Sequence, residues 1–362
     1  MSRSGSEASL PARLAAVWPS VVAALPPAWR AGLKDARQVS PRVWRIELSA
    51  GRVLALKLAA ERAPLDVEVQ ALHWLGRHRC SVPAVLAVSS ERPPQWVALE
   101  WCGDQTLDVA AQGAGAARRA RLGRELALAL AEIEGAFAPF TARAQADAAR
   151  WQAQIQALRA QAAPWLAQAP ATLAWLLGRD VPRKVGSSLR LAGEVALHAP
   201  AAAGSLDYSA SNVVVGRGRL VVVDFAAIGV DWPARRFVQY GTATGAAARE
   251  PPRGTFATVI TPEAVCAYAA RAAALQGATV EAVQEMVDAH DLLLLLAAGE
   301  HLRLIQAGRA EAERALAWAN VPERRQALLA LIQRPLVRHG PAAAVRSWVR
   351  ARTERSGSVP LT

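Results

Sequence analysis

Residues 204–229 read GSLDYSASNVVVGRGRLVVVDFAAIG, and this stretch decides the fold. Two short β-branched runs, Val213–Val215 and Leu220–Val223, flank the sequence Gly216-Arg217-Gly218. Two β-branched runs separated by a glycine-containing turn are typical of a β-hairpin. The stretch therefore predicts two paired strands joined by a tight turn.

Polar residues stand at the outer ends of this hairpin. Asn212 directly precedes the first strand, Asp224 directly follows the second, and Asp207 lies on the loop that leads in. Because a hairpin brings its outer ends together, Asn212 and Asp224 should meet at one end of the ladder. Carboxylate and amide oxygens suit Mg²⁺ that carries a phosphate-bearing substrate. The alternative is that these residues only form turns, as Asp and Asn often do.

The same residues resemble the catalytic core of the aminoglycoside phosphotransferase and protein-kinase-like superfamily. The family loop reads H-G-D-x-x-x-x-N, and residues 205–212 read SLDYSASN, with Asp207 and Asn212 at the family spacing. The family metal motif begins D-F, and Asp224-Phe225-Ala226 matches it. The resemblance implies ATP and Mg²⁺ as cofactors, Asp207 as the catalytic base, and Asn212 and Asp224 as the metal ligands.

Upstream, residues 53–58 read VLALKL, which predicts a strand with its leucines on one face and Val53, Ala55 and Lys57 on the other. The chain has only three lysines among its 42 basic residues, so a lysine at this position is informative. An ammonium group is a known partner of phosphate. By the resemblance, Val53 and Ala55 line the adenine slot and Lys57 reaches the α- and β-phosphates.

A helix is expected to follow at residues 65–75, because Leu65, Val69 and Leu72 recur at helical spacing. Glu68 falls on this apolar stripe, where an unpaired carboxylate would be costly to bury. Lys57 is the expected partner, as in the family's Lys–Glu pair that holds the lysine against the nucleotide. Alternatively, Glu68 lies at the edge of the stripe and reaches water.

Strand patterns end at Trp101-Cys102-Gly103-Asp104, where the family has the hinge between its lobes. The resemblance implies that the backbone at Glu100 and Trp101 binds adenine. We therefore expect an α+β, two-lobed, protein-kinase-like fold. Residues 1–103 would form a small lobe with an antiparallel sheet and one main helix, and residues 104–362 a larger, mainly helical lobe with the acceptor region.

Composition excludes several classes of protein. More than half of the 362 residues are apolar, and the net charge of +12 comes from arginines spread along the chain, with only a modest cluster near the end. A nucleic-acid partner is therefore not expected.

The longest purely apolar run, Leu292–Ala298, is too short to span a bilayer. Three widely spaced cysteines suggest a reducing, cytoplasmic setting. Nothing in the sequence indicates the oligomeric state.

Several residues depart from the family pattern. Ser205-Leu206 stands in place of His-Gly, and Arg236 in place of an Asp that braces the catalytic loop. Arg236 can only donate hydrogen bonds, so it would either donate to loop carbonyls or pair with Asp207. Residues 34–41, expected to form the phosphate-covering loop, lack glycine. His198, expected on a short strand at 195–198, is a weak candidate to replace the family histidine.

The function implied by the resemblance is ATP-dependent phosphoryl transfer to a hydroxyl of a small molecule. Only a short stretch follows the metal motif where protein kinases have an activation segment, which disfavours a protein substrate. No acidic acceptor cluster is evident, so a polycationic aminoglycoside is not the expected acceptor. The alternative function is that of a nucleotide-binding pseudokinase that acts as a scaffold or regulatory protein.

Overall fold

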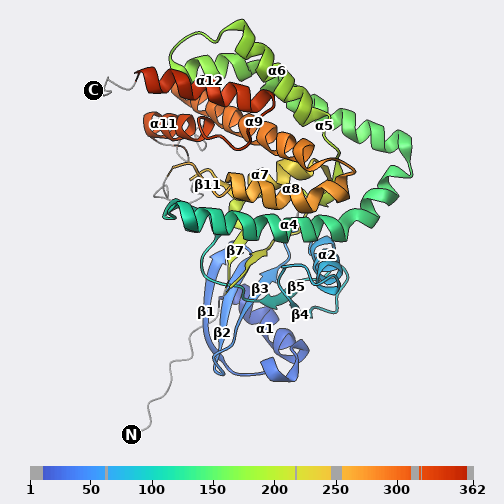
Figure 1. Ribbon diagram of the computed structural model, residues 1–362. Helices are drawn as coiled ribbons and strands as arrows, with labels where there is room; N and C mark the ends of the chain where they lie inside the picture. The colour runs from blue at the N-terminus through green and yellow to red at the C-terminus, as the bar shows by residue number, and fades with distance from the viewer. Residues whose placement is uncertain are drawn as a thin grey trace.

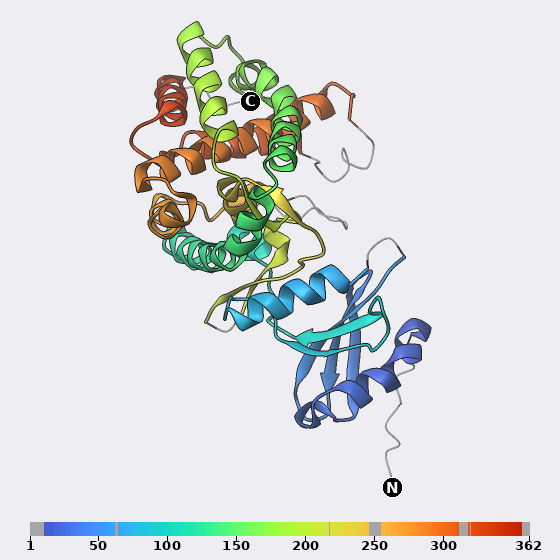
Figure 2. The same cartoon turned by 90° about the vertical axis from the view of Figure 1, so that its right-hand side faces the viewer.

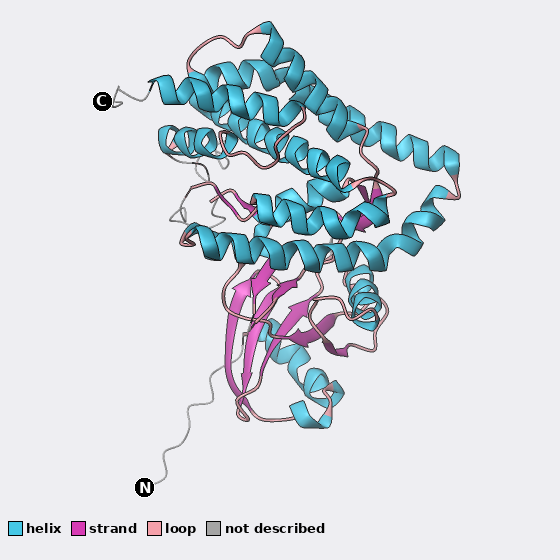
Figure 3. Cartoon of the chain, viewed as in Figure 1, coloured by secondary structure: helices cyan, strands magenta, loops and turns pink. Residues whose placement is uncertain are grey.

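The computed structural model describes residues 11–61, 64–216, 218–245, 255–310, 318 and 320–356. Figure 1 shows a smaller part that contains the main sheet and a larger part built mostly of helices. The same division is visible when the chain is coloured by secondary structure (Figure 3). The predicted α+β architecture is confirmed: a small antiparallel sheet with one main helix is followed by a larger, mainly helical part. The exact division at residue 103 stays a prediction.

The main sheet has five antiparallel strands in the order β1-β2-β3-β5-β4. Its strands are β1 (Leu33–Ser40), β2 (Val43–Leu48), β3 (Val53–Leu58), β4 (Val85–Val88) and β5 (Trp96–Glu100). The helices α1 (Ala12–Ala24) and α2 (Asp66–Arg77) lie on opposite faces of this sheet (Figure 2). The alternation predicted for β3 is confirmed, because its leucines are buried in the cluster that α1 covers.

Residues 34–41 do not form the loop that the sequence suggested. They belong almost entirely to β1, which pairs with β2 along its length and places Gln38 opposite Trp44. The segment was not recognised as a strand because it lacks a buried apolar face. An edge strand does not need one, since the backbone hydrogen bonds of β1 come from β2. The turn between the two strands is confined to Pro41 and Arg42.

The larger part is built around two apolar cores. The first contains residues of α4, α7 and α8 together with α2 and the hairpin, and the second contains residues of α5, α6, α9, α11 and α12. These helices and the short α3 have the bounds α3 (Leu107–Gln112), α4 (Ala116–Gln145), α5 (Ala148–Leu177), α6 (Arg183–Leu197), α7 (Pro233–Gly241), α8 (Pro262–Gln276), α9 (Val280–Gln306), α11 (Val321–Ile332) and α12 (Pro341–Ser356). A two-stranded ladder of β10 (Thr242–Ala243) and β11 (Ala257–Thr258) lies beside them.

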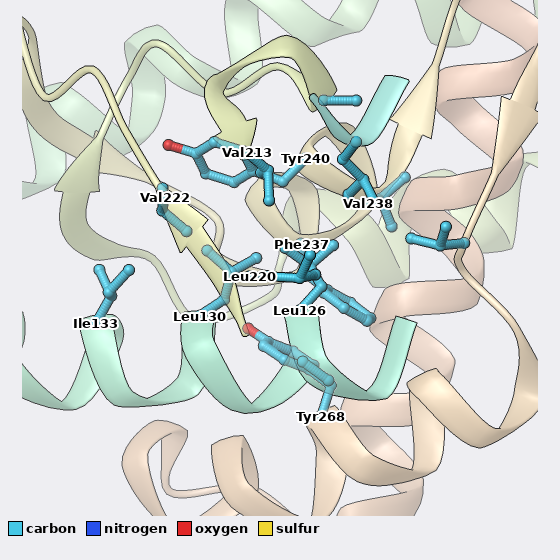
Figure 4. Packing of buried hydrophobic residues seen from close by; sticks show 14 of the residues in the cluster. Leu126, Leu130, Ile133, Val213, Leu220, Val222, Phe237, Val238, Tyr240 and Tyr268 are labelled. Carbon is cyan, nitrogen blue, oxygen red and sulfur yellow. The ribbon is translucent and has the colours of Figure 1, made fainter. Parts of the chain in front are cut away.

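The predicted hairpin is confirmed as β7 (Val213–Val215) and β8 (Leu220–Val222), and it lies at the junction of the two parts (Figure 1). Its turn residue Arg217 is outside the described residues, as are residues 1–10 at the start of the predicted small lobe. The hairpin packs its apolar side chains against α4 and α7, and Leu220, Leu126 and Phe237 belong to one buried cluster (Figure 4).

A second antiparallel pair leads into the hairpin. It is formed by β6 (Ala202–Ser205) and β9 (Ile228–Asp231), with Ser205 opposite Ile228. His198 is not on a strand: residues 195–197 complete α6, and His198 caps its end with an exposed ring. The expected strand was wrong because Val195–Leu197 continues the apolar side of an amphipathic helix.

The hairpin is also tied to the small lobe at Gly103. This glycine has φ 153°, and a Cβ there would come within 2.9 Å of the Val215 carbonyl oxygen. Only glycine allows so close a backbone approach in this conformation. None of the helices among the described residues is both long and apolar enough to cross a bilayer.

Candidate active site

The structure brings together the three polar residues predicted at the end of the hairpin. The Val223 amide donates to the Asn212 carbonyl oxygen at 2.8 Å. This bond places Asn212 next to the residue that precedes Asp224. The Asn212 side-chain amide donates to the Asp207 carbonyl oxygen at 3.0 Å. This bond uses the nitrogen of the Asn212 amide and leaves its oxygen available to another partner.

Asp224 adopts a left-handed backbone conformation with φ 65°. Such a conformation is uncommon for a residue with a Cβ, although Asp tolerates it better than most. Residues held in this way concentrate at functional sites. The turn directs the chain from β8 into the Phe225 core position, and Phe225 is fully buried.

Lys57 lies between two carboxylates. Its Nζ is 2.7 Å from Glu68 Oε2 and 2.8 Å from Asp224 Oδ1, so it connects α2 to the residue that follows the hairpin. The side chains of Lys57 and Glu68 are 6% and 1% exposed. Burial raises the pKa of Glu68, and the charge of Lys57 opposes that shift. The predicted contact between Lys57 and Glu68 is present, whereas its role toward a nucleotide stays a prediction.

We expect the Lys57–Glu68 contact to be coupled to nucleotide affinity. Lys57→Ala should weaken MgATP binding strongly and Glu68→Gln less, with a coupling energy of about 0.5–3 kcal/mol in a double-mutant cycle because the two groups touch. Titration of the four proteins with MgATP measures it. The exposed Lys34–Glu47 pair on the same sheet is the control, and its cycle should leave MgATP affinity unchanged. Independent effects of Lys57 and Glu68 would remove Glu68 from the site.

Asp207 lies on the loop between β6 and the hairpin, with a side chain that reaches solvent. Partial burial of its surroundings raises the pKa of this carboxyl, and the neighbouring Asp224 raises it further. The loop is fixed at the backbone, because the Asp207 amide donates to Ser205 Oγ at 3.2 Å and Tyr240 Oη donates to the Asp207 carbonyl oxygen at 3.5 Å. A carboxylate with a raised pKa is better matched to proton transfer near neutral pH.

Arg236 braces this loop through carbonyl groups, the first of the two alternatives that the sequence left open. Its guanidinium donates to the carbonyl oxygens of Ser205 at 3.0 Å, Ala203 at 3.4 Å, Ala202 at 2.6 Å and Gly229 at 3.4 Å. The residue is 3% exposed. It therefore holds both strands of the β6–β9 pair, directly before the loop that carries the catalytic candidate.

Two neighbours complete the surroundings of Arg236. A Cβ on Gly204 would lie 2.7 Å from Arg236 Nη1, so the guanidinium packs directly against the Gly204 backbone. On another side, the charge of Arg236 lowers the pKa of Glu134, but burial outweighs it and raises that pKa to about 7. Tyr268 Oη donates to the same carboxylate at 2.8 Å.

Sequence reasoning missed a polar cluster beside the loop. Tyr208 Oη donates to Asp231 Oδ2, and Arg235 Nη1 lies 3.3 Å from that same oxygen. Asp231 is 2% exposed and also accepts from the Trp232 amide at 2.7 Å. No sequence pattern indicated that Tyr208, Asp231 and Arg235 would meet.

The residues expected to hold adenine lie at the end of β5 and on the face of β3 away from α1. Val53 and Ala55 are partly buried, and Leu54 of β3 is the pairing partner of Glu100. Trp101 donates from Nε1 to Asp104 Oδ1 at 3.2 Å, and Arg45 lies over its ring. The assignment of Val53, Ala55, Glu100 and Trp101 to nucleotide binding stays a prediction.

The side-chain oxygens of Asn212 and Asp224 suit Mg²⁺, which needs few protein ligands, better than a metal ion that is coordinated only by protein side chains. Among the described residues, no three His, Cys, Asp or Glu side chains gather in a group that could hold a metal ion. Mg²⁺ typically binds one or two carboxylates and completes its shell with waters and substrate phosphates. Asp224 and the free amide oxygen of Asn212 meet that pattern.

Three comparisons with known proteins bear on the family. Residues 32–273 match the family model described as "Phosphotransferase enzyme family". A search of curated proteins finds no match. Among solved structures, the chain resembles an aminoglycoside phosphotransferase from Alicyclobacillus acidocaldarius at 15% identity, covering 96% of this chain and 100% of that one, with a TM-score of 0.47.

Two further solved structures have similar scores. A choline kinase from Cryptosporidium parvum is 10% identical, covers 96% of this chain and 98% of that one, and gives a TM-score of 0.46. A ternary complex of APH(2")-IIa with streptomycin and ATP is 12% identical, covers 87% of this chain and 96% of that one, and gives a TM-score of 0.41. Since the family model spans well over half of the sequence, the chain belongs to the phosphotransferase enzyme family.

Proposed function

We propose that this protein transfers the γ-phosphate of ATP to a hydroxyl group of a small molecule. The observation that carries the proposal is the junction of Lys57, Glu68 and Asp224, which links the sheet of the small lobe to the hairpin of the large one. An ion pair buried between two lobes, with Asp207 and Asn212 beside it, is the arrangement that phosphoryl transfer in this superfamily requires.

Each residue has a distinct role in this proposal. Lys57 binds the α- and β-phosphates, and Glu68 holds the lysine in place. Asp207 orients the acceptor hydroxyl and takes its proton. Asn212 and Asp224 hold Mg²⁺, which when bound neutralises charge on the transferred phosphoryl group.

The chain that follows the metal motif supports a small acceptor. Only three residues separate Asp224 from β9, which begins at Ile228, and α7 begins soon after at Pro233. Protein kinases place a long activation segment here to bind a peptide. A segment this short leaves the acceptor to be recognised by the helices of the large lobe.

MgATP should stabilise the protein, and Asp224→Asn should abolish that effect. At a hundredfold excess of ligand over its dissociation constant, the gain is about 2.7 kcal/mol. For a chain of this size the melting temperature should rise by about 2–4 °C per kcal/mol. The variant keeps the shape of the side chain but removes the charge that faces Lys57, so its melting temperature without ligand is the baseline from which its response to MgATP is measured. Thermal unfolding with and without MgATP measures both.

Three outcomes of that experiment are informative. Stabilisation of the original protein alone supports the metal assignment. Equal stabilisation of the Asp224→Asn variant would place the metal elsewhere. No stabilisation of either protein would contradict nucleotide binding and hence the proposed function.

A nucleotide-binding protein without catalysis is the second candidate. The observation that favours it is the loop itself, where Ser205 and Leu206 replace the family's His-Gly and Arg236 replaces the bracing Asp. Both candidates share the MgATP site. They differ in whether Asp207 contributes to turnover.

A further inference from the structure

The residue that follows the proposed catalytic base is held by its own side chain. Tyr208 is half-buried and packs against the first apolar core of the large lobe. Its ring lies edge-on to the ring of Tyr240, with the two centroids 6.3 Å apart, and the Arg235 guanidinium lies 5.8 Å from the centroid of the Tyr208 ring. The Tyr208 side chain therefore has a defined place beside α7, one residue after Asp207.

The Tyr208 hydroxyl is bonded to a carboxylate that is itself fixed. It donates to Oδ2 of Asp231, the last residue of β9. Asp231 is buried, accepts from the Trp232 amide at 2.7 Å through Oδ1, and pairs with Arg235 at 3.3 Å. Because an unsatisfied buried carboxylate is costly, Asp231 cannot easily turn away from any of these partners.

The protonation of Tyr208 favours this bond. Burial raises the pKa of the Tyr208 hydroxyl, and the charge of Asp231 raises it further. The hydroxyl therefore keeps its proton at neutral pH and donates it to the Asp231 carboxylate. Hydrogen bonds to a charged acceptor are shorter and roughly twice as strong as bonds between neutral groups. The link between the loop and β9 is therefore a strong one.

A fixed Tyr208 restricts the direction of Asp207. The two residues share a planar peptide group, so anchoring the Tyr208 side chain limits the positions that are open to the Asp207 Cα atom. The chain before Asp207 is anchored as well, because Arg236 donates to the Ser205 carbonyl oxygen at 3.0 Å. Since the Asp207 side chain is exposed, the backbone on either side of it determines where its carboxylate points.

A purely structural role gives little reason for a buried charge at Asp231. Apolar residues that pack well can often replace a buried ion pair without loss of stability. A catalytic group, by contrast, must be held within about 0.5 Å of its productive position by side chains that are themselves fixed. A directional bond that ends one residue from Asp207 meets this requirement.

We propose that Tyr208 and Asp231 are positioning residues, which orient the Asp207 carboxylate toward the acceptor hydroxyl without contacting either substrate. The proposal rests on the proposed function and adds a support for the catalytic loop that is separate from Arg236. The hydroxyl of Tyr208 should then affect turnover only through Asp207.

Tyr208→Phe tests this role, because it removes one hydroxyl and keeps the ring. The rate of ATP turnover is measured in single turnovers with excess protein, with water in place of the acceptor hydroxyl. We expect the rate to fall by about 10- to 100-fold, since a displacement of about 1 Å can cost 10²-fold. The dissociation constant of MgATP should stay within about twofold, because neither Tyr208 nor Asp231 is assigned to the nucleotide or the metal.

The decisive measurement repeats Tyr208→Phe in the Asp207→Asn variant. Once the base is removed, Tyr208 has no carboxylate left to orient. The second substitution should then change the remaining rate by less than about twofold. A hydroxyl that only stabilised the fold would lower the rate by the same factor with or without Asp207.

Three further variants separate geometry from stability. Asp231→Asn keeps an oxygen that can accept from Tyr208, so it should retain more turnover than Asp231→Leu, which keeps none. Thr172→Val removes another buried bond from a hydroxyl to a carboxylate, the one that joins α5 to Glu300 of α9 at 2.7 Å, and should leave turnover unchanged. Thermal unfolding verifies that each variant is folded.

The outcomes distinguish this proposal from the proposed function. Unchanged turnover in Tyr208→Phe, equal factors of loss with and without Asp207, or an equal loss in Thr172→Val would overturn the positioning role and leave the proposed function in place. If the original protein turns over ATP no faster than Asp207→Asn, no base operates and the positioning role is wrong. Failure of the original protein to bind MgATP would instead contradict the proposed function.

Discussion

Asp207→Asn is expected to lower the rate of phosphoryl transfer by about 10²–10⁴-fold, the usual contribution of a positioned general base. The amide keeps the size of the carboxylate but cannot accept the proton of the acceptor hydroxyl. The contacts that fix the loop involve the backbone of Asp207, so they should survive the substitution. Turnover of ATP with candidate alcohols, sugars and amino alcohols measures the effect.

MgATP binding provides the internal control for this variant. The dissociation constant of MgATP should stay within about twofold of the original value, because Asp207 is not among the residues assigned to the nucleotide or the metal. A hundredfold loss of turnover with intact binding is then a loss of transition-state stabilisation. If the original protein and the variant turn over equally slowly with every acceptor, yet MgATP stabilises both, the protein is a nucleotide-binding pseudokinase. A loss of nucleotide affinity as large as the loss of turnover would place Asp207 in the nucleotide site.

Arg236→Met is expected to cost about 3–5 kcal/mol of unfolding free energy, the scale seen when one partner of a buried charged network is removed. The substitution keeps much of the side-chain length but leaves four carbonyl groups without their donor. Turnover should fall as well, because Ser205 and Gly204 directly precede the catalytic loop. Urea unfolding at constant pH gives the first quantity, and the rate of ATP turnover gives the second.

The deficit of the Arg236→Met variant should depend on pH through Glu134. In the original protein the pKa of Glu134 is raised to about 7, so the folded state holds its proton more tightly than the unfolded state. Stability contributed by this group is present below the unfolded pKa and is lost as the pH rises toward 7. Without Arg236 the pKa rises further, so the deficit should grow above pH 7.

Two comparisons test the account of Arg236. Arg236→Lys keeps the charge without the planar fork, and should recover part of the stability but less of the turnover. Arg190→Met removes an exposed arginine of α6 and should change stability by no more than about 0.5 kcal/mol. A loss for Arg236→Met as small as that for Arg190→Met would show that the loop does not depend on this brace.

The sequence predicted the parts of the site that depend on local spacing. The β7–β8 hairpin follows from two β-branched runs and a glycine turn, and the Lys57–Glu68 contact follows from the phase of a strand and a helix close together in the chain. Contacts between distant segments were not predictable in the same way. Tyr208 and Asp231 meet only because β6 pairs with β9, and periodicity within a segment gives no information on that pairing.

The two errors had a common physical cause. Residues 34–41 and 195–198 were assigned from what a family member would need at those places, but backbone hydrogen bonding decided both. The first segment pairs with β2, and the second continues the amphipathic pattern of α6. The partners of Arg236 were left open for a different reason. A guanidinium can reach several carbonyls, and which ones it reaches depends on the packing of Gly204 against it.

The two faces of α7 have a consequence for how the sequence of this helix can vary. Arg236 and Tyr240 hold the catalytic loop, while Arg235 pairs with Asp231, the partner of Tyr208, so the same short helix backbone carries both sets of contacts. A substitution that shifts α7 should therefore disturb the loop on both sides of Asp207 at once. Relatives that keep this loop should vary less along α7 than along helices that do not contact it.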